Sequence, residues 1–176
     1  NEPLAYRDTP KTLEEYVGQE HVIGEGKILY RTIKADRLSS IILFGPPGCG
    51  KTSLARVISE TTKYKFYKIN AVTAGVSDIK KVIEETKNFM LNPTGKSILF
   101  IDEIHRFNKL QQDALLPYVE NGTIILIGAT TENPYFEVNK ALISRSMVIK
   151  LEPLTTENIY TVLKNALKNK EGLRRI

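Results

Sequence analysis

The clearest chemical pattern in the chain is the run GPPGCGKT, from Gly45 to Thr52. It matches G-x-x-x-x-G-K-[ST], with an apolar run before it and a helical pattern after it. Gly48 and Gly50 allow the backbone to turn so that successive N–H groups face phosphate oxygens, and the following helix adds its positive end. Lys51 supplies a positive charge to the terminal phosphates, and the Thr52 hydroxyl is placed to bind Mg²⁺. The run therefore predicts a site for ATP or ADP with Mg²⁺, lined by Gly45, Pro46, Pro47, Gly48, Cys49, Gly50, Lys51, Thr52 and Ser53.

An acidic pair, Asp102-Glu103, directly follows the apolar run 98–101. In open parallel sheets ligands bind at the carboxyl ends of the strands, so we expect this pair near the glycine-rich loop. Asp102 can hold Mg²⁺, directly or through water, and Glu103 can orient or deprotonate the water that attacks the γ-phosphoryl group. A solvated acidic turn is the alternative, but the presence of the loop favours the catalytic interpretation.

Other polar residues fall at the same edge of the expected sheet. Asn70 ends the second apolar run, and Thr130 and Thr131 end the fourth, so each could contact the water or Glu103. A role as simple turn formers fits them equally well. Arg145, just before the fifth run, could reach a γ-phosphate as an arginine finger, and a surface ion pair is the alternative.

The remaining reactive residue types carry less information. Cys49 could be a nucleophile, but no base is specified near it, and we interpret it as an ordinary loop residue. His105 and Arg106 follow the acidic pair and are expected to face solvent or another subunit. His21 has no metal-ligand partners at a recognisable spacing and is interpreted as structural.

Short apolar runs alternate with longer amphipathic stretches, an order typical of β-α units. Continuous apolar strands separated by helices predict an α/β fold, a parallel sheet covered on both faces in three layers. The expected strands are 41–44, 66–70, 97–101, 123–129 and 147–151. The expected helices are 53–60, one capped by Ser77 or Asp78 with Ile79, Val82, Ile83 and Phe89 on one face, 109–118 with Leu110, Ala114 and Leu115 as its apolar stripe, and 138–143.

The β-α pattern breaks at Glu152-Pro153-Leu154, after which Thr155 or Thr156 can cap one more amphipathic helix. We therefore expect a nucleotide-binding α/β domain over 1–152 and the first helix of a second, truncated helical domain over 153–176. The chain begins with Asn1 rather than Met and shows no apolar signal core, so we expect it to start inside a longer polypeptide.

Composition excludes several classes of protein. The chain has 176 residues, 41% of them hydrophobic and 26% charged, which is typical of a globular domain. Its apolar runs fall short of the roughly 18 residues that cross a bilayer, so no membrane segment is expected. A single cysteine favours a reducing cytosol.

The net charge of +5 favours a polyanion as a binding partner without requiring one. A basic tail fits either DNA contact or a solvated helix face, and consists of Lys164, Lys168, Lys170, Arg174 and Arg175.

Taken in order, the motifs GPPGCGKT, ILFIDEIH, GATTENP and ISRS resemble those of the AAA+ ATPases, a class of P-loop NTPases. From about Leu4 to Leu154 the chain is similar to the replication-associated recombination protein A family and the related Werner-helicase-interacting protein. The stretches that carry this resemblance are VGQEHVIGEGKILYRTIKADRLSSIILFGPPGCGKT, NAVTAGVSDIK and IDEIHRFNKLQQDALLPYVENGTIILIGATTENPYFEVNKALISRS. The resemblance implies the core of an oligomeric, DNA-stimulated ATPase that acts at stalled or gapped replication forks, in recombination and in repair.

The resemblance also implies roles for individual residues. These are Walker A for Lys51 and Thr52, Walker B for Asp102 and Glu103, sensor 1 for Thr131, a finger acting on a neighbour's ATP for Arg145, and a switch restraining Glu103 for Asn70. The segment that includes Tyr16, Val17 and Gly18 resembles one that packs on adenine, with Ile23 nearby. The helix after Pro153 would then begin a helical lid.

Two departures from the family limit what we expect of this chain. Asp8-Thr9 precede Pro10 where the family has an arginine, and the family's sensor 2 arginine and tetramerising domain are not in the chain. We therefore expect weak nucleotide binding, a mainly monomeric state and slow hydrolysis. The full-length protein is expected to be a cytoplasmic, nucleoid-associated tetramer with DNA and single-strand binding protein as partners. The alternatives are a clamp-loader-like subunit, disfavoured by the presence of Glu103, and a branch-migration motor.

Overall fold

The computed structural model describes residues 31–33, 35 and 37–153, and this part of the chain contains a five-stranded sheet. The strand order is β2-β3-β4-β1-β5, and every pair of neighbours is parallel. The strands are β1 Ile41–Phe44, β2 Lys65–Asn70, β3 Ser97–Asp102, β4 Ile124–Thr130 and β5 Met147–Lys150. The predicted α/β fold with a parallel sheet is confirmed, and every strand begins and ends within one residue of its predicted bounds.

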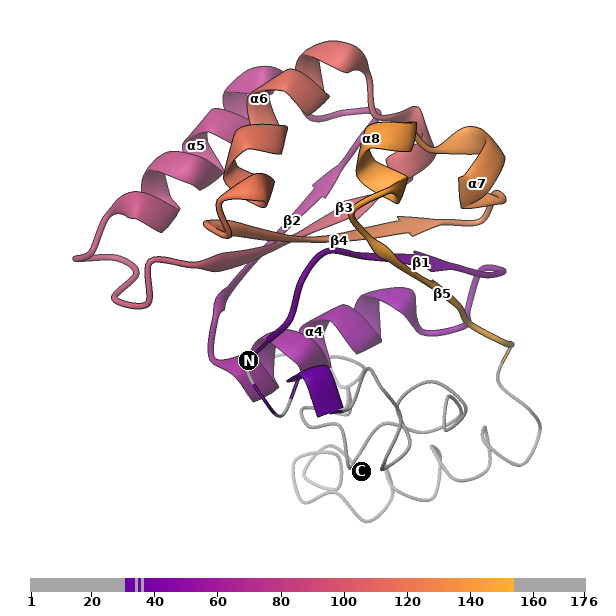
Figure 1. Ribbon diagram of the computed structural model, residues 1–176, viewed down its shortest axis with the longest axis horizontal. Helices are drawn as coiled ribbons and strands as arrows, with labels where there is room; N and C mark the ends of the chain where they lie inside the picture. Colours follow the sequence, from indigo (N-terminus) through magenta and orange to yellow (C-terminus); the bar gives the residue numbers. More distant parts are fainter. Residues whose placement is uncertain (1–30, 34, 36, 154–176) are drawn as a thin grey trace, which may run out of the picture.

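Helices cover both faces of this sheet, which gives the predicted three layers (Figure 1). Of the described helices, α4 lies over one face, where Ile33 packs into the same apolar cluster, and α5, α6, α7 and α8 lie over the other. Their bounds are α4 Lys51–Thr62, α5 Val76–Lys87, α6 Lys109–Glu120, α7 Pro134–Glu137 and α8 Lys140–Ile143, with a short 3₁₀ helix, η1, over Ile104–Arg106.

The alternation of side chains along the strands explains this layering. In β3, Ile98 and Phe100 belong to the apolar cluster packed against α4, whereas Leu99 and Ile101 belong to the cluster packed against α5 and α6. All four are fully buried, because successive residues of a strand point to opposite faces and both faces are covered. This double coverage is why the strand reads as a continuous apolar run.

The start and end of α5 differ from the prediction. Gly75, and not Ser77 or Asp78, is the residue that precedes the helix, and the Asp78 carboxylate accepts a 2.7 Å hydrogen bond from the Gly75 N–H. Asp78 therefore stabilises the helix end from inside the first turn. The helix ends at Lys87, so the prediction that Phe89 lies on its apolar face is wrong, and Phe89 is 75% exposed.

The buried face of α6 is the predicted one only in part, since Leu115 is buried and Ala114 packs against the same cluster, as expected. Leu110, expected in the apolar stripe, is 70% exposed, and the buried residues of the helix are Gln111, Gln112 and Leu115. Gln111 Nε2 donates to Ala71 O at 2.9 Å and to Ala74 O at 2.8 Å. A polar side chain faces inward here because it satisfies two carbonyl groups of the loop after β2.

The loop between α5 and β3 is held by a buried amide. Asn92 is 3% exposed, and its Nδ2 donates to Lys96 O at 3.0 Å and to Ser97 Oγ at 3.1 Å. Its Oδ1 accepts from the Thr94 hydroxyl at 2.8 Å. The side chain thereby ties the loop to the first residue of β3, at the end of the strand opposite to Asp102.

Several predictions lie outside the described residues. These are the adenine segment with Tyr16, Val17, Gly18 and Ile23, the assignment of His21, the helix after Pro153 with the basic tail, and hence the division between 1–152 and 153–176. Among the residues that are described, no helix has the length and apolar composition needed to cross a membrane.

Candidate functional site

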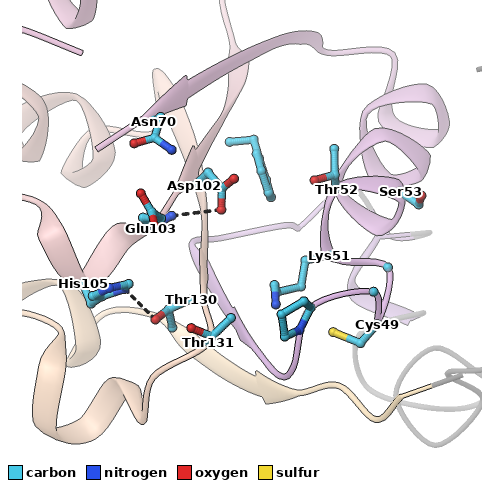
Figure 2. A pocket seen from close by; sticks show the side chains of 14 residues that line it. Cys49, Lys51, Thr52, Ser53, Asn70, Asp102, Glu103, His105, Thr130 and Thr131 are labelled. Atoms are coloured by element: carbon cyan, nitrogen blue, oxygen red, sulfur yellow. Dashed lines mark hydrogen bonds between the residues drawn. The ribbon is translucent and has the colours of Figure 1, made fainter. Parts of the chain in front are cut away.

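A pocket of about 540 Å³ lies where β1, β3 and β4 end and α4 begins (Figure 2). It brings together residues that are as far apart in the sequence as Pro47 and Thr131. Its lining consists of Pro47, Gly48, Cys49, Gly50, Lys51, Thr52, Ser53, Asn70, Phe100, Asp102, Glu103, His105, Thr130 and Thr131. Most of the residues predicted from the sequence to act on nucleotide therefore share one cavity.

The glycine-rich loop depends on backbone conformations that other residues rarely adopt. Gly48 and Gly50 have φ angles of 81° and 89°, in the left-handed region. Gly50 directly precedes α4, which begins at Lys51 and not at Ser53 as predicted. A Cβ on Gly45 would lie 2.6 Å from Leu151 O, so this position has no room for a side chain. The loop thus aims backbone N–H groups and the positive end of α4 into the pocket.

Two side chains of the loop have different surroundings. Lys51 Nζ donates to Gly45 O at 2.6 Å and to Pro46 O at 3.2 Å, which holds the ammonium group across the mouth of the loop. Cys49 is 1% exposed and belongs to the core cluster beneath α4. This burial supports its interpretation as a loop residue and not as a nucleophile.

The acidic pair forms a tight turn at the end of β3. Asp102 is the last residue of the strand and is half-buried, and Glu103 is exposed. Glu103 has a φ angle of 54°, one of only two non-glycine residues with positive φ in the described part of the chain. Its N–H donates to Asp102 Oδ1 at 3.0 Å. A left-handed residue that is not glycine is a strained conformation, and such conformations are concentrated at functional sites.

The packing beneath this turn was not predicted. η1 follows Glu103, and its first residue, Ile104, is buried against β4 at Gly128. A Cβ on Gly128 would lie 3.0 Å from Ile104 Cγ1 and 2.9 Å from Ile42 Cδ1. Only glycine lets the turn pack this closely on the sheet. The sequence feature that corresponds to this packing is Gly128, the glycine of the GATT run. The sequence alone does not link this glycine to Ile104.

The end of β4 contributes two hydroxyl groups with different surroundings. Thr130 is 2% exposed, and its Oγ1 shares a 2.8 Å hydrogen bond with His105 Nδ1 and accepts one from the Glu132 N–H at 3.0 Å. Thr131 is exposed and lines the pocket. His105, which we expected to face solvent or another subunit, is half-buried and lies in the pocket wall (Figure 2).

Asn70 reaches the pocket from the edge of the sheet. It ends β2 and is the register partner of Asp102 in the neighbouring strand. Its Oδ1 accepts a 2.8 Å hydrogen bond from the Val72 N–H, which fixes the side-chain orientation. Figure 2 shows it beside Asp102 and Glu103. This position is compatible with the predicted switch, which stays a prediction.

Arg145 lies away from the pocket formed by its own chain. Its Nη2 is 3.3 Å from Glu120 Oε1, its Nε donates to Ala141 O at 3.3 Å, and its side chain is 44% exposed. The surface ion pair that we weighed as an alternative is therefore present. An action on the ATP of another subunit stays a prediction.

The oxygen groups of the pocket fit magnesium carried by a nucleotide. Mg²⁺ usually keeps several waters and is bound by one or two protein groups together with substrate phosphates. Thr52 and Asp102 both line the pocket and supply a hydroxyl and a carboxylate. Within 31–33, 35 and 37–153, no group of three or more His, Cys, Asp or Glu residues could hold an ion unaided.

Residues 41–153 match the sequence pattern of the family described as "ATPase family associated with various cellular activities (AAA)". The chain belongs to the AAA ATPase family. Within this family, it is 51% identical to "Replication-associated recombination protein A" of Haemophilus influenzae, over 97% of the chain. It is also 51% identical to the protein of that name from Escherichia coli K12, over 96% of the chain. "ATPase WRNIP1" of Dictyostelium discoideum is 50% identical over 94% of the chain. The AAA domain and these relatives confirm the resemblance to the replication-associated recombination protein A family.

The chain spans 38% of the length of the two bacterial relatives and 19% of the Dictyostelium protein. Among solved structures, the AAA domain is similar to the RuvB Holliday junction branch migration motor of Thermotoga maritima. The TM-score is 0.74 at 27% identity, covering 92% of this chain and 54% of the motor. The structural likeness supports the P-loop AAA+ fold that we expected.

Proposed function

We propose that this AAA domain is the ATP-binding and ATP-hydrolysing core of a DNA-dependent ATPase in replication-fork maintenance, recombination and repair. The observation that carries the proposal is the meeting of Lys51, Asp102 and Glu103 around one pocket at the end of a parallel sheet. A glycine-rich loop by itself would serve a kinase or a transporter equally well. The acidic pair adds a group that can activate water, which favours hydrolysis.

In the proposed reaction, the loop N–H groups and Lys51 bind the β- and γ-phosphates of ATP. Thr52 and Asp102 would hold Mg²⁺, which supplies charge neutralisation for the phosphate oxygens. Glu103 orients the attacking water and accepts its proton, and the exposed Thr131 hydroxyl contacts the γ-phosphate or the water. Asn70, placed next to the acidic pair, restrains Glu103 until the site is complete.

The site is proposed to be shared between subunits. The Arg145 guanidinium is exposed and lies outside its own pocket, and Tyr135 and Phe136 of the same segment are 60% and 83% exposed. Aromatic residues and arginine are enriched at protein interfaces. Arg145 then acts on the ATP of a neighbour in a tetramer of the full-length protein. The 176-residue chain alone is mainly monomeric and hydrolyses ATP slowly.

The proposed setting is the cytoplasmic nucleoid, with single-stranded, gapped or forked DNA and single-strand binding protein as partners. The names of the bacterial relatives support replication and recombination. A branch-migration motor acting on DNA is the second candidate, favoured by the likeness to RuvB. A clamp-loader-like subunit that hydrolyses little is less compatible with the presence of Glu103 in the pocket.

The test is ATP turnover by the full-length protein alone and with single-stranded, gapped or forked DNA. We expect DNA to raise the rate. We also expect Lys51→Ala and Arg145→Ala to be inactive separately and to recover activity when mixed, because the first still supplies Arg145 to the second. A rate that DNA does not change, with mixtures as inactive as their components, would refute a DNA-dependent ATPase with a shared site.

A further inference from the structure

A single hydrogen bond joins the turn after β3 to the end of β4. His105 Nδ1 and Thr130 Oγ1 are 2.8 Å apart, although they are separated by 25 positions in the chain. His105 lies in η1, two residues after Glu103, and Thr130 directly precedes Thr131. The bond therefore links the segment that carries the acidic pair to the segment that carries the exposed hydroxyl (Figure 2).

The surroundings of Thr130 make this link specific. Thr130 is 2% exposed, and its Oγ1 also accepts from the Glu132 N–H at 3.0 Å. Its hydroxyl thus has one partner in the turn after β3 and one in the loop after β4. A buried hydroxyl with two partners has little freedom to rotate. A shift of the turn after β3 is therefore expected to move the loop after β4 with it.

The turn is held on β4 at two places. Ile104 packs on the glycine surface at Gly128, and His105 bonds to Thr130 two residues further along the same strand. Glu103 directly precedes these two anchors and has a left-handed backbone. The position of its carboxylate is therefore fixed relative to β4 as well as to β3.

We propose that His105 is a positioning residue for ATP hydrolysis. Its bond with Thr130 keeps Glu103 at a fixed distance from Thr131, so that the carboxylate which orients water and the hydroxyl at the γ-phosphate move together. This inference rests on the proposed function. The role assigned to His105 is exercised through Glu103 and not through a contact with nucleotide.

Four substitutions distinguish the effect of the hydrogen bond from the effect of side-chain size. In His105→Asn the carboxamide occupies the position of Nδ1, at the same number of bonds from the backbone, and can donate or accept. His105→Phe keeps a ring but lacks the bond. Thr130→Val keeps the buried volume without the hydroxyl, and Thr130→Ser keeps the hydroxyl.

The experiment is steady-state ATP turnover by the full-length protein, with thermal unfolding of each variant as the control for folding. Loss of one positioning hydrogen bond is expected to lower kcat about 10-fold in His105→Phe and in Thr130→Val, with KM for ATP changed by less than about 2-fold. His105→Asn and Thr130→Ser are expected to stay within about 3-fold of wild type. The double variant His105→Phe/Thr130→Val should be no slower than either single variant.

The results that would contradict the positioning role differ from those that would contradict the proposed function. His105→Asn as slow as His105→Phe, a rise in KM at constant kcat, or additive losses in the double variant would each overturn the positioning role. Wild-type hydrolysis with unchanged rates in all four variants would overturn the role of His105 alone. A wild-type protein that does not hydrolyse ATP overturns the proposed function and this inference with it.

Discussion

Replacing Gly128 by Ala is predicted to disturb the turn that carries Glu103. The new Cβ would lie 2.9 Å from Ile42 Cδ1, and 3.0 and 3.1 Å from Ile104 Cγ1 and Cβ. Ile42 Cδ1 ends a side chain that can rotate, whereas Ile104 Cβ is fixed to the backbone of η1. Both isoleucines are fully buried, so neither has free space to enter. Overpacking of this kind costs about 1–3 kcal/mol and lowers the melting temperature by roughly 3–10 °C in a domain of this size.

The same displacement is expected to slow hydrolysis, because Ile104 directly follows Glu103. A shift of about 1 Å in a catalytic group can cost about 100-fold in rate, and we expect a loss of about 10- to 100-fold in the full-length protein. Thermal unfolding followed by circular dichroism and steady-state ATP turnover measure the two effects.

A matched control and a double variant isolate the contact with Ile104. Gly75→Ala adds the same methyl group where the nearest atom is 3.8 Å away, and it should leave turnover unchanged and lower the melting temperature by less than about 3 °C. Gly128→Ala/Ile42→Val relieves only the contact with Ile42, so turnover should stay low. A Gly128→Ala protein with wild-type turnover and a melting temperature within about 1 °C of wild type would refute the packing argument.

Three further predictions address the loop, the fold and the subunit contact. Lys51→Ala should weaken binding of a fluorescent ATP analogue at least about 10-fold, because a charge-assisted contact to phosphate is lost, and unchanged affinity would contradict this. Asn92→Ala leaves buried partners unsatisfied and should lower the free energy of unfolding in urea by about 2–3 kcal/mol without changing nucleotide affinity; a weaker affinity would contradict the separation of this loop from the site. Arg145→Ala should lower turnover of the full-length protein by about 10³-fold while changing stability by less than about 1 kcal/mol, since its ion pair with Glu120 is exposed, and normal turnover would contradict the proposed finger.

Features that depend on local pattern could be predicted from the sequence. The strands are recognisable because double burial makes each a continuous apolar run, and the carboxyl ends of parallel strands must meet at one edge. Lys51, Asp102 and Thr131 could therefore be placed together in advance. The start of α4 was missed by two residues, because Gly50 precedes the helix without a side chain that could signal a cap.

Features that depend on contacts between distant segments could not be predicted. Leu110 is exposed and Gln111 is buried because two carbonyl groups of another loop require a donor at that place. Gly128 is explained only by the close approach of Ile104, and His105 only by its bond to Thr130. Helical periodicity and residue type contain no information on such partners.

The measurement that tests the central claim most directly compares ATP binding and ATP hydrolysis by full-length wild type and Glu103→Gln. The amide keeps the size of the side chain but cannot accept a proton from water. We predict nucleotide affinity within about 3-fold of wild type and a fall in kcat of at least about 100-fold. Hydrolysis by Glu103→Gln at the wild-type rate would contradict the claim that this pocket is an ATPase site in which Glu103 activates water.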